Sequence, residues 1–599
     1  MRFRFLLRLF AVLLILFVVQ KVVFMLYNMG MADGAPFLSC LAVLWHGLRL
    51  DVATACYLVI IPTVVLIVSF FFQRFPLRRV LVPYYVLIAT VFMLAFAVDL
   101  VLYSYWGSKP DANDLIYAAK PREALAGLPI WFTIIGFAIL ALLVWGCVML
   151  MRWVTPRTLP PANSLRSRLV ALLFIPVGGL IFLGMRGSVT ESTANPSFVY
   201  FSPHAFCNHA ALNPTFNMFH SLFKVQDLAA EFDIMSSDEV QATLGDSYIP
   251  DRTLDINLLS TSRPNVLLII WEGAGSGMVD NDTVAPNLQS LKREGVFFSR
   301  CFANSYRTDR GLVAVLSGWL GLPTATVMKR PDLCRNLPSV ASSLAAEGYH
   351  TRMTFGGDID YTNMRMYFME TGFADVRGSE TYPSALYTGA WGVPDHYVLT
   401  SDLIPHERPF FSTVLTLSSH EPWDVDYHRL ADNRQNAFAY TDSCIGVLVD
   451  SLRRQPLWDS MLVVIVPDHG CTFRPGQAPA DTAVAAIPIL WTGGALAVHG
   501  MVVDRLMNQT DLVATLLAQM QVDITPFPFS RNVLGSSYNE RVPFAVHAVK
   551  NHMNLITPQG AWAYDCVSRT LAPADTSRQH FAEALLQHLY TTTAALSSR

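Results

Sequence analysis

Two acidic residues and a histidine directly follow apolar runs that are typical of buried strands. Glu272 follows NVLLIIW at 265–271, and Asp468 and His469 follow VVIVP at 463–467. In an open α/β sheet, reactive groups lie in the crevice beyond the carboxyl ends of the strands. Carboxylate oxygens and an imidazole nitrogen suit Zn²⁺ or Mn²⁺. The pattern predicts that the three residues bind one metal ion; a helix cap and a hydrogen-bonded turn are the structural alternatives.

A threonine at the start of an expected helix is a candidate nucleophile. In RTDRGLVAVLSG, polar residues give way to small and apolar ones after Thr308. Free N–H groups and the helix dipole favour an anion at such a position, and a metal that lowers the pKa of the hydroxyl can make it a nucleophile. Arg307 and Arg310 flank it, and guanidinium groups suit phosphate oxygens. The alternative is a plain threonine N-cap.

The N-terminal part of the chain is expected to lie in a membrane. The 599-residue chain is 52% hydrophobic and 15% charged, whereas soluble domains have about 25% charged residues. The apolar excess lies before residue 186, and with about 20 residues per span we expect spans at 5–27, 52–72, 80–103, 130–151 and 169–185. Arginine-rich segments at 2–8, 74–79 and 152–168 would then share the cytoplasmic side. All residues after 186 are expected to lie outside the cytoplasm.

The rest of the chain alternates apolar strand-like runs with helical stretches. This pattern predicts a mainly parallel sheet covered by helices. We expect a five-helix transmembrane domain at 1–186, a connector at 187–262, an α/β catalytic domain at 263–540 and a C-terminal extension at 541–599 that ends in a helix. The net charge of −3 and the absence of a basic stripe argue against nucleic-acid binding.

The order of these motifs resembles a known family. Glu272 after the first strand, then RTDRG, SSHEPW and PDHG behind five N-terminal spans, are similar to the lipoteichoic acid synthase family. That family is a membrane-bound branch of the alkaline phosphatase and sulfatase superfamily. The resemblance covers nearly the whole chain and implies an extracytoplasmic α/β domain of that superfamily, anchored in a bacterial cytoplasmic membrane.

The resemblance also implies a reaction. Glu272, Thr308, Asp468 and His469 would bind one divalent metal, usually Mn²⁺, with Zn²⁺ or Mg²⁺ as alternatives. Thr308 would attack a phospholipid donor such as phosphatidylglycerol and form a phosphoglycerol-threonine intermediate. The group would then pass to a glycan, polymer or lipid acceptor, which the sequence does not identify.

Further positions carry over from the family. His420 in SSHEPW would assist proton transfer. Asp358 and Arg365 in FGGDIDYTNMRMYF would contact the donor head group; Asn363 stands where the family usually has tryptophan. WGVPDHY also matches a family motif, in which Trp391 and Asp395 would contact substrate or merely support the fold.

Four other functions remain to be weighed. Sulfate-ester hydrolysis needs Cys or Ser in a CxPxR or SxPxR setting, which RTDRG lacks. A phosphoethanolamine transferase is the nearest competing enzyme, and WEGAGSG differs from the form typical of that group. A phosphoester hydrolase would use water as the acceptor. An inactive membrane scaffold or sensor would have no need of the intact Glu, Thr, Asp and His set.

Overall fold

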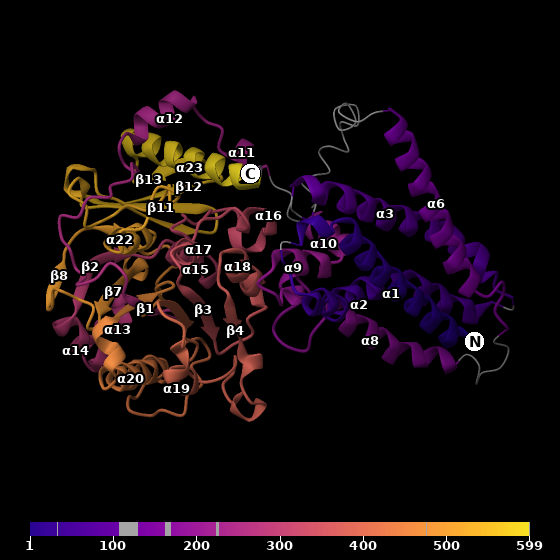
Figure 1. Ribbon diagram of the computed structural model, residues 1–599, viewed down its shortest axis with the longest axis horizontal. Helices are drawn as coiled ribbons and strands as arrows, with labels where there is room; N and C mark the ends of the chain where they lie inside the picture. The colour runs from indigo at the N-terminus through magenta and orange to yellow at the C-terminus, as the bar shows by residue number, and fades with distance from the viewer. Residues whose placement is uncertain are drawn as a thin grey trace. The chain divides into compact units, whose positions relative to one another are not determined.

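The chain folds into two compact units. The computed structural model describes residues 1–32, 34–72, 74–106, 109, 130–161, 169–222, 227–474 and 476–597. One unit is formed by residues 1–226 and the other by residues 227–599 (Figure 1). The segment expected as a connector, 187–262, thus contributes to both units.

The N-terminal unit contains long apolar helices. Four of its described helices are long and apolar enough to cross a bilayer: α1 (Arg2–Tyr27), α2 (Phe37–Val68), α3 (Leu77–Trp106) and α6 (Ile130–Val154). The expected fifth span is a shorter apolar helix, made of a 3-10 turn at Val170–Leu173 and α8 (Phe174–Arg186). Four of the five expected spans are therefore supported by helix length, and part of the arginine-rich segment 152–168 lies outside the described residues.

The buried acidic residues Asp51 and Asp99 of this helical unit lie in ion pairs. Lys21 of α1 forms a buried ion pair with Asp51 of α2, and Asn213 Nδ2 donates to Asp51 Oδ1 over 2.8 Å. Lys109 Nζ lies 2.5 Å from Asp99 Oδ2 of α3. Asn213 separates α9 (Ala205–Ala211) from α10 (Pro214–Leu222), two short helices that contact α2 and α3 respectively. These contacts give the acidic residues of the predicted spans a structural role.

The C-terminal unit is built on a mainly parallel sheet, as the sequence predicts. The strand order is β4-β3-β5-β1-β6-β7-β2-β8, with β9 beside β2, and only β7 runs antiparallel to its neighbours. The strands are β1 (Asn265–Trp271), β2 (Val296–Phe302), β3 (His350–Phe355), β4 (Asp375–Arg377), β5 (Phe410–Leu415), β6 (Met461–Pro467), β7 (Ala486–Thr492), β8 (Met501–Val503) and β9 (Met507–Asn508). Every residue of β1, β5 and β6 is buried, which explains their unbroken apolar runs.

Helices cover both faces of this sheet. Leu267, Ile269 and Trp271 of β1 pack in one apolar core with α14 (Pro286–Glu294) and α20 (Asn433–Arg453). Figure 1 shows α15 (Thr308–Ser317), α17 (Val340–Ala346), α18 (Met364–Glu370) and α22 (Asp511–Gln519) on the other side. Successive side chains of a strand alternate between the two faces, so a buried strand needs both layers. The shorter helices are α11 (Leu228–Glu231), α12 (Ser237–Leu244), α13 (Ser276–Val279), α16 (Pro331–Cys334), α19 (Asp395–Val398) and α21 (Thr482–Ala485).

The C-terminal segment contains a second sheet in addition to the expected terminal helix. Antiparallel strands β10 (Ala545–Val549), β11 (His552–Thr557), β12 (Gly560–Asp565) and β13 (Thr570–Ala572) precede α23 (Thr576–Ser597). Ala548 N donates to Asn304 O over 2.7 Å, and Ser305 Oγ donates to Ala548 O over 2.7 Å. The small sheet thus supports the segment that leads into α15.

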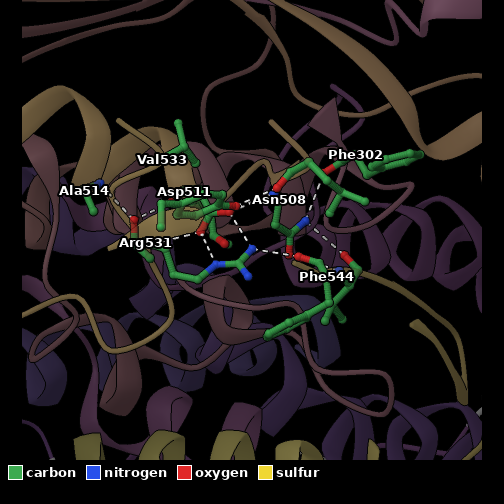
Figure 2. A network of polar contacts seen from close by, with 12 residues as sticks. Phe302, Asn508, Asp511, Ala514, Arg531, Val533 and Phe544 are labelled. Carbon is green, nitrogen blue, oxygen red and sulfur yellow. Dashed lines mark hydrogen bonds and ion pairs between the residues drawn. The ribbon is translucent and has the colours of Figure 1, made fainter. Parts of the chain in front are cut away.

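Asp511 of α22 and Arg531 form a buried ion pair (Figure 2). Arg531 Nη2 lies 2.6 Å from Asp511 Oδ2, and Arg531 Nε donates to Asp511 Oδ1 over 3.0 Å. Asn508 N donates to Asp511 Oδ2 over 2.8 Å, and Arg531 Nη2 also donates to Phe544 O over 2.8 Å. Each charged atom of Asp511 therefore has a donor.

Candidate metal centre

The sheet register places Glu272 and Asp468 side by side. β1 and β6 are parallel neighbours, and Trp271 is paired with Pro467 at their ends. The next residue of each strand is a carboxylate, and both side chains are buried, with 6% and 0% of their surface exposed. Two strands that end in register therefore bring two acidic groups to one point of the sheet edge.

His469 completes a group of three ligand atoms. One ligand atom each from Glu272, Asp468 and His469 lies within 4.8 Å of the other two. His469 Nε2 is 3.5 Å from Glu272 Oε1 and 3.3 Å from Asp468 Oδ2. His469 Nδ1 lies 2.8 Å from Gly470 O, and because a carbonyl only accepts, this contact assigns the proton to Nδ1 and leaves Nε2 as a ligand.

The charges of this group fit a divalent cation. Asp468 Oδ1 accepts hydrogen bonds from the N–H groups of Gly273 and His469, both at 2.9 Å. Asp468 Oδ2 is buried and accepts no hydrogen bond within the described chain. Burial, and next the Asp468 carboxylate, raise the pKa of Glu272 well above its usual range. Buried carboxylates stay charged when they are paired or bind a metal. A divalent cation would therefore bind Asp468 Oδ2 and stabilise the charged form of Glu272.

Thr308 faces the same three residues from α15. Thr308 is the first residue of that helix, and its Oγ1 lies 3.4 Å from Glu272 Oε2 and 3.5 Å from His469 Nε2. Gly311 lies one turn later, where a Cβ atom would come within 2.0 Å of Asp468 O. The glycine of RTDRG therefore lets the helix approach the carboxylate segment, and the motif brings the predicted nucleophile to the predicted ligands.

The two arginines beside Thr308 differ in their surroundings. Arg307 is exposed, with its guanidinium carbon 5.8 Å from the centre of the Tyr306 ring. Arg310 Nε and Nη2 donate to the carbonyls of Leu322 and Ala325 over 3.2 and 2.9 Å. Arg310 therefore stabilises the loop that follows α15, whereas the Arg307 side chain is exposed to solvent beside Thr308.

The predicted head-group residues form a network of their own. Arg365 donates to Asp360 Oδ1 over 2.8 Å and to Glu380 Oε1 over 2.6 Å. Asp358 Oδ1 accepts from Asp360 N over 3.1 Å. Asn363 has a φ of 67°, in the left-handed region where asparagine is enriched. The structure thus gives Arg365 two carboxylate partners and gives Asn363 a backbone role.

His420 and Trp391 border a pocket of about 520 Å³. Their rings lie 5.0 Å apart at their centres, and Trp391 Nε1 donates to Glu421 O over 2.5 Å. Asp395 is buried beneath them and accepts from Thr441 Oγ1 and from the N–H groups that follow β5, at 2.7 to 3.1 Å. Asp395 therefore has the contacts of a residue that stabilises the loop after β5.

Three residues that contact the predicted ligand segments were not identified from the sequence. Thr416 Oγ1 accepts from Glu272 N over 3.0 Å, and Ser419 Oγ donates to Glu272 O over 2.7 Å. Both residues follow β5, the strand beside β1. Hydroxyl residues directly after a buried strand could have indicated this role in the sequence. Gln509 Nε2 donates to the carbonyls of Pro467 and Asp468, both at 2.7 Å, and no local pattern indicates this role.

Residues 264–522 of the C-terminal unit are similar to a known family of domains. The model of the family described as Sulfatase matches residues 264–522. A solved structure of a protein in the alkaline phosphatase superfamily from Vibrio parahaemolyticus is 24% identical with a TM-score of 0.51, and the alignment covers 61% of this chain and 99% of that one.

Two other solved structures are similar at lower scores. The lipoteichoic acid synthase LtaP from Listeria monocytogenes is 16% identical with a TM-score of 0.48, over 61% of this chain and 99% of that one. The C-terminal periplasmic domain of EcEptC from Escherichia coli is 16% identical with a TM-score of 0.36, over 49% and 92% of the two chains.

Proposed function

We propose that the protein transfers a phosphoglycerol group from a membrane phospholipid to an extracytoplasmic acceptor, through a phospho-threonine intermediate. The observation that carries the proposal is the approach of Thr308 Oγ1 to Glu272 and His469 at 3.4 and 3.5 Å. Glu272, Asp468, His469 and Thr308 would hold one divalent metal, with Mn²⁺ preferred over Zn²⁺ or Mg²⁺ on the family resemblance.

The reaction would proceed in two displacements. When bound, the metal supplies positive charge that lowers the pKa of the threonine hydroxyl and offsets charge on the phosphoryl oxygens. Thr308 Oγ forms a bond to phosphorus, the bond from phosphorus to the diacylglycerol oxygen breaks, and diacylglycerol leaves with a proton. An acceptor hydroxyl then displaces Thr308. His420 would donate or accept the proton, and Arg307 would bind a phosphoryl oxygen.

The proposal requires the catalytic unit to face outward. With the N-terminal arginines in the cytoplasm, an odd number of spans is needed, so Val170–Arg186 would be the fifth. As a helix these residues reach about 26 Å, close to the roughly 30 Å hydrocarbon core. A reporter fused at the C-terminus, active only outside the cytoplasm, tests this orientation in a bacterial host. An inactive reporter, together with activity of a second reporter that works only in the cytoplasm when it is fused at the same position, would reject it.

A second candidate, phosphoethanolamine transfer, is favoured by the pocket beside His420. Trp391, Tyr397 and Tyr440 line it together with Asp424 and Asp426, and no lysine or arginine is among its described lining residues. Aromatic faces and carboxylates suit an ammonium group. This pocket would bind the ethanolamine group of that donor.

Diacylglycerol release from vesicles separates these functions. The full-length protein in detergent would be given Mn²⁺ and vesicles that contain either phosphatidylglycerol or phosphatidylethanolamine, beside Thr308→Ala. Release from phosphatidylglycerol that Thr308→Ala abolishes supports the first proposal. Release only from phosphatidylethanolamine selects the second. Free glycerol phosphate without acceptor would indicate a hydrolase, and no turnover of either lipid despite bound Mn²⁺ would indicate an inactive scaffold or sensor.

A further inference from the structure

Gln509 joins the two segments that carry the candidate site. Its side chain is fully buried, after β9 and before α22. Gln509 Oε1 accepts from Asn304 N over 3.0 Å. Its Nε2 donates to Pro467 O and to Asp468 O, both at 2.7 Å. One carboxamide thus binds the segment before Thr308 and the segment that ends in Asp468 and His469.

These two segments approach closely at a second point. Asn304 follows β2 and lies four residues before Thr308. Asp468 O accepts from Gln509 and also faces Gly311 of α15, where a Cβ atom would lie within 2.0 Å of it. The main chain at Asp468 is therefore fixed from one side by the amide and from the other by the helix of Thr308.

The glutamine itself has a rigid support. Gln509 N donates to Phe302 O over 2.9 Å. The neighbouring Asn508 donates through Nδ2 to Phe302 O and Val546 O, over 2.9 and 3.1 Å, and its N–H binds Asp511. Asp511 in turn is held by Arg531, as Figure 2 shows. This chain of contacts connects the small C-terminal sheet to the carbonyl of Asp468.

We propose that Gln509 is a positioning residue that sets the distance between Thr308 and the metal ligands Asp468 and His469. This inference rests on the metal site of the proposed function. A carboxamide can accept from one segment and donate to the other at the same time, which an aliphatic side chain of the same size cannot. Groups that orient metal ligands from behind change metal affinity or activity by about 10- to 100-fold when they are replaced.

Another buried glutamine provides a matched control. Gln519 of α22 also bridges two main-chain groups: its Oε1 accepts from Leu258 N and its Nε2 donates to Ile256 O, both at 2.7 Å. It is 2% exposed, and both of these partners lie outside the candidate site. The same replacement at both positions therefore separates general destabilisation from an effect on the metal ligands.

The test is Mn²⁺ affinity of the full-length protein in detergent, measured by the electron paramagnetic resonance signal of free Mn²⁺. Gln509→Glu keeps the shape and replaces the donor, Gln509→Met removes all three hydrogen bonds without adding charge, and Gln519→Glu and Gln519→Met are the controls. Thermal midpoints are recorded in EDTA. We expect both Gln509 variants to weaken Mn²⁺ binding at least about 10-fold, and the Gln519 variants to stay within about twofold at a similar loss of thermal midpoint.

Equal Mn²⁺ affinity in the Gln509 and Gln519 variants would overturn the proposal. If only one Gln509 variant folds, its Mn²⁺ affinity is compared with that of the variant that has the same replacement at Gln519. A wild-type protein that binds Mn²⁺ but releases diacylglycerol from neither lipid rejects the proposed function while the positioning of the ligands still stands. A wild-type protein that binds no Mn²⁺ rejects both.

Discussion

Two buried aspartates at the same sheet have opposite surroundings. Asp511 is fully buried, and its two oxygens receive hydrogen bonds from Arg531 and from main-chain N–H groups. Asp468 is equally buried, but its Oδ2 accepts no hydrogen bond from the described residues and faces His469 at 3.3 Å, beside Glu272. A buried polar group without a donor is costly, so Asp511 is explained by the fold alone and Asp468 calls for a ligand.

Removal of the Asp511 charge should have the largest effect on stability. Asp511→Asn leaves the Arg531 guanidinium buried without its counter-ion, and loss of one partner of a buried pair costs about 3–5 kcal/mol. The free energy of unfolding in urea, with EDTA present, measures this loss. The exposed pair of Arg252 and Asp523 provides a control, because Asp523→Asn should change little. Equal losses of unfolding free energy in Asp511→Asn and Asp523→Asn would contradict a structural role of the buried ion pair.

Mn²⁺ should stabilise the protein through Asp468. At a free concentration about 100 times the dissociation constant, a ligand that binds only the folded state adds about 2.7 kcal/mol. Thermal shift with and without Mn²⁺ measures this gain in the wild type and in Asp468→Asn. We expect the variant to lose the gain and, in EDTA, to be at least as stable as the wild type, because one of two adjacent buried carboxylates is gone. A variant less stable than wild type in EDTA would place Asp468 in the same class as Asp511.

The close approach at Gly311 should couple α15 to the metal ligands. Gly311→Ala places a Cβ atom against the rigid main chain of Asp468, so helix and carboxylate must separate. We expect Mn²⁺ to bind about 10-fold more weakly, which corresponds to about 1.4 kcal/mol. Isothermal titration calorimetry measures it. Gly446→Ala is the control, because the atoms nearest to its Cβ atom would belong to the Asn287 side chain and not to the main chain. An equal loss of Mn²⁺ affinity in Gly446→Ala would contradict a coupling through Gly311.

The smallest expected effect is a pH dependence that is independent of the metal. Burial lowers the pKa of His588 below 6.5. The unfolded chain therefore binds more protons than the folded one as pH falls below about 6.5, so stability decreases on acidification until the folded pKa is passed. In EDTA, the loss of unfolding free energy from pH 7 to pH 5 should be smaller in His588→Gln than in the wild type. An unchanged loss would contradict this assignment.

The features that the sequence predicted depend on local pattern. Unbroken apolar runs at 265–271 and 461–467 predict buried parallel strands, and the residues directly after them meet because parallel strands end at one edge. The grouping of Glu272, Asp468 and His469 follows from that geometry. Thr308 was predicted instead from the change of composition at the start of α15. The antiparallel direction of β7 depends on its pairing with β2, which lies far away in the sequence. The small sheet at 545–572 is built from consecutive hairpins of short strands, which the sequence analysis did not separate from the rest of the C-terminal extension.

The predictions of substrate contacts depended on side-chain partners that no motif displays. Arg310 binds carbonyls 12 and 15 residues later, and Arg365 binds Glu380. Gln509 reaches Asp468 only because β9 pairs with β2. In each case the residue type was visible in the sequence, but its partner was set by tertiary structure.

The central claim is that Glu272, Asp468 and His469 together form a metal centre. The most direct test is anomalous diffraction from crystals of the protein grown with Mn²⁺, recorded on both sides of the manganese absorption edge. We predict one strong anomalous peak within coordination distance of Glu272, Asp468 and His469, with Thr308 Oγ1 facing it. A peak elsewhere with none at this cluster, or no peak at saturating Mn²⁺, would contradict the account.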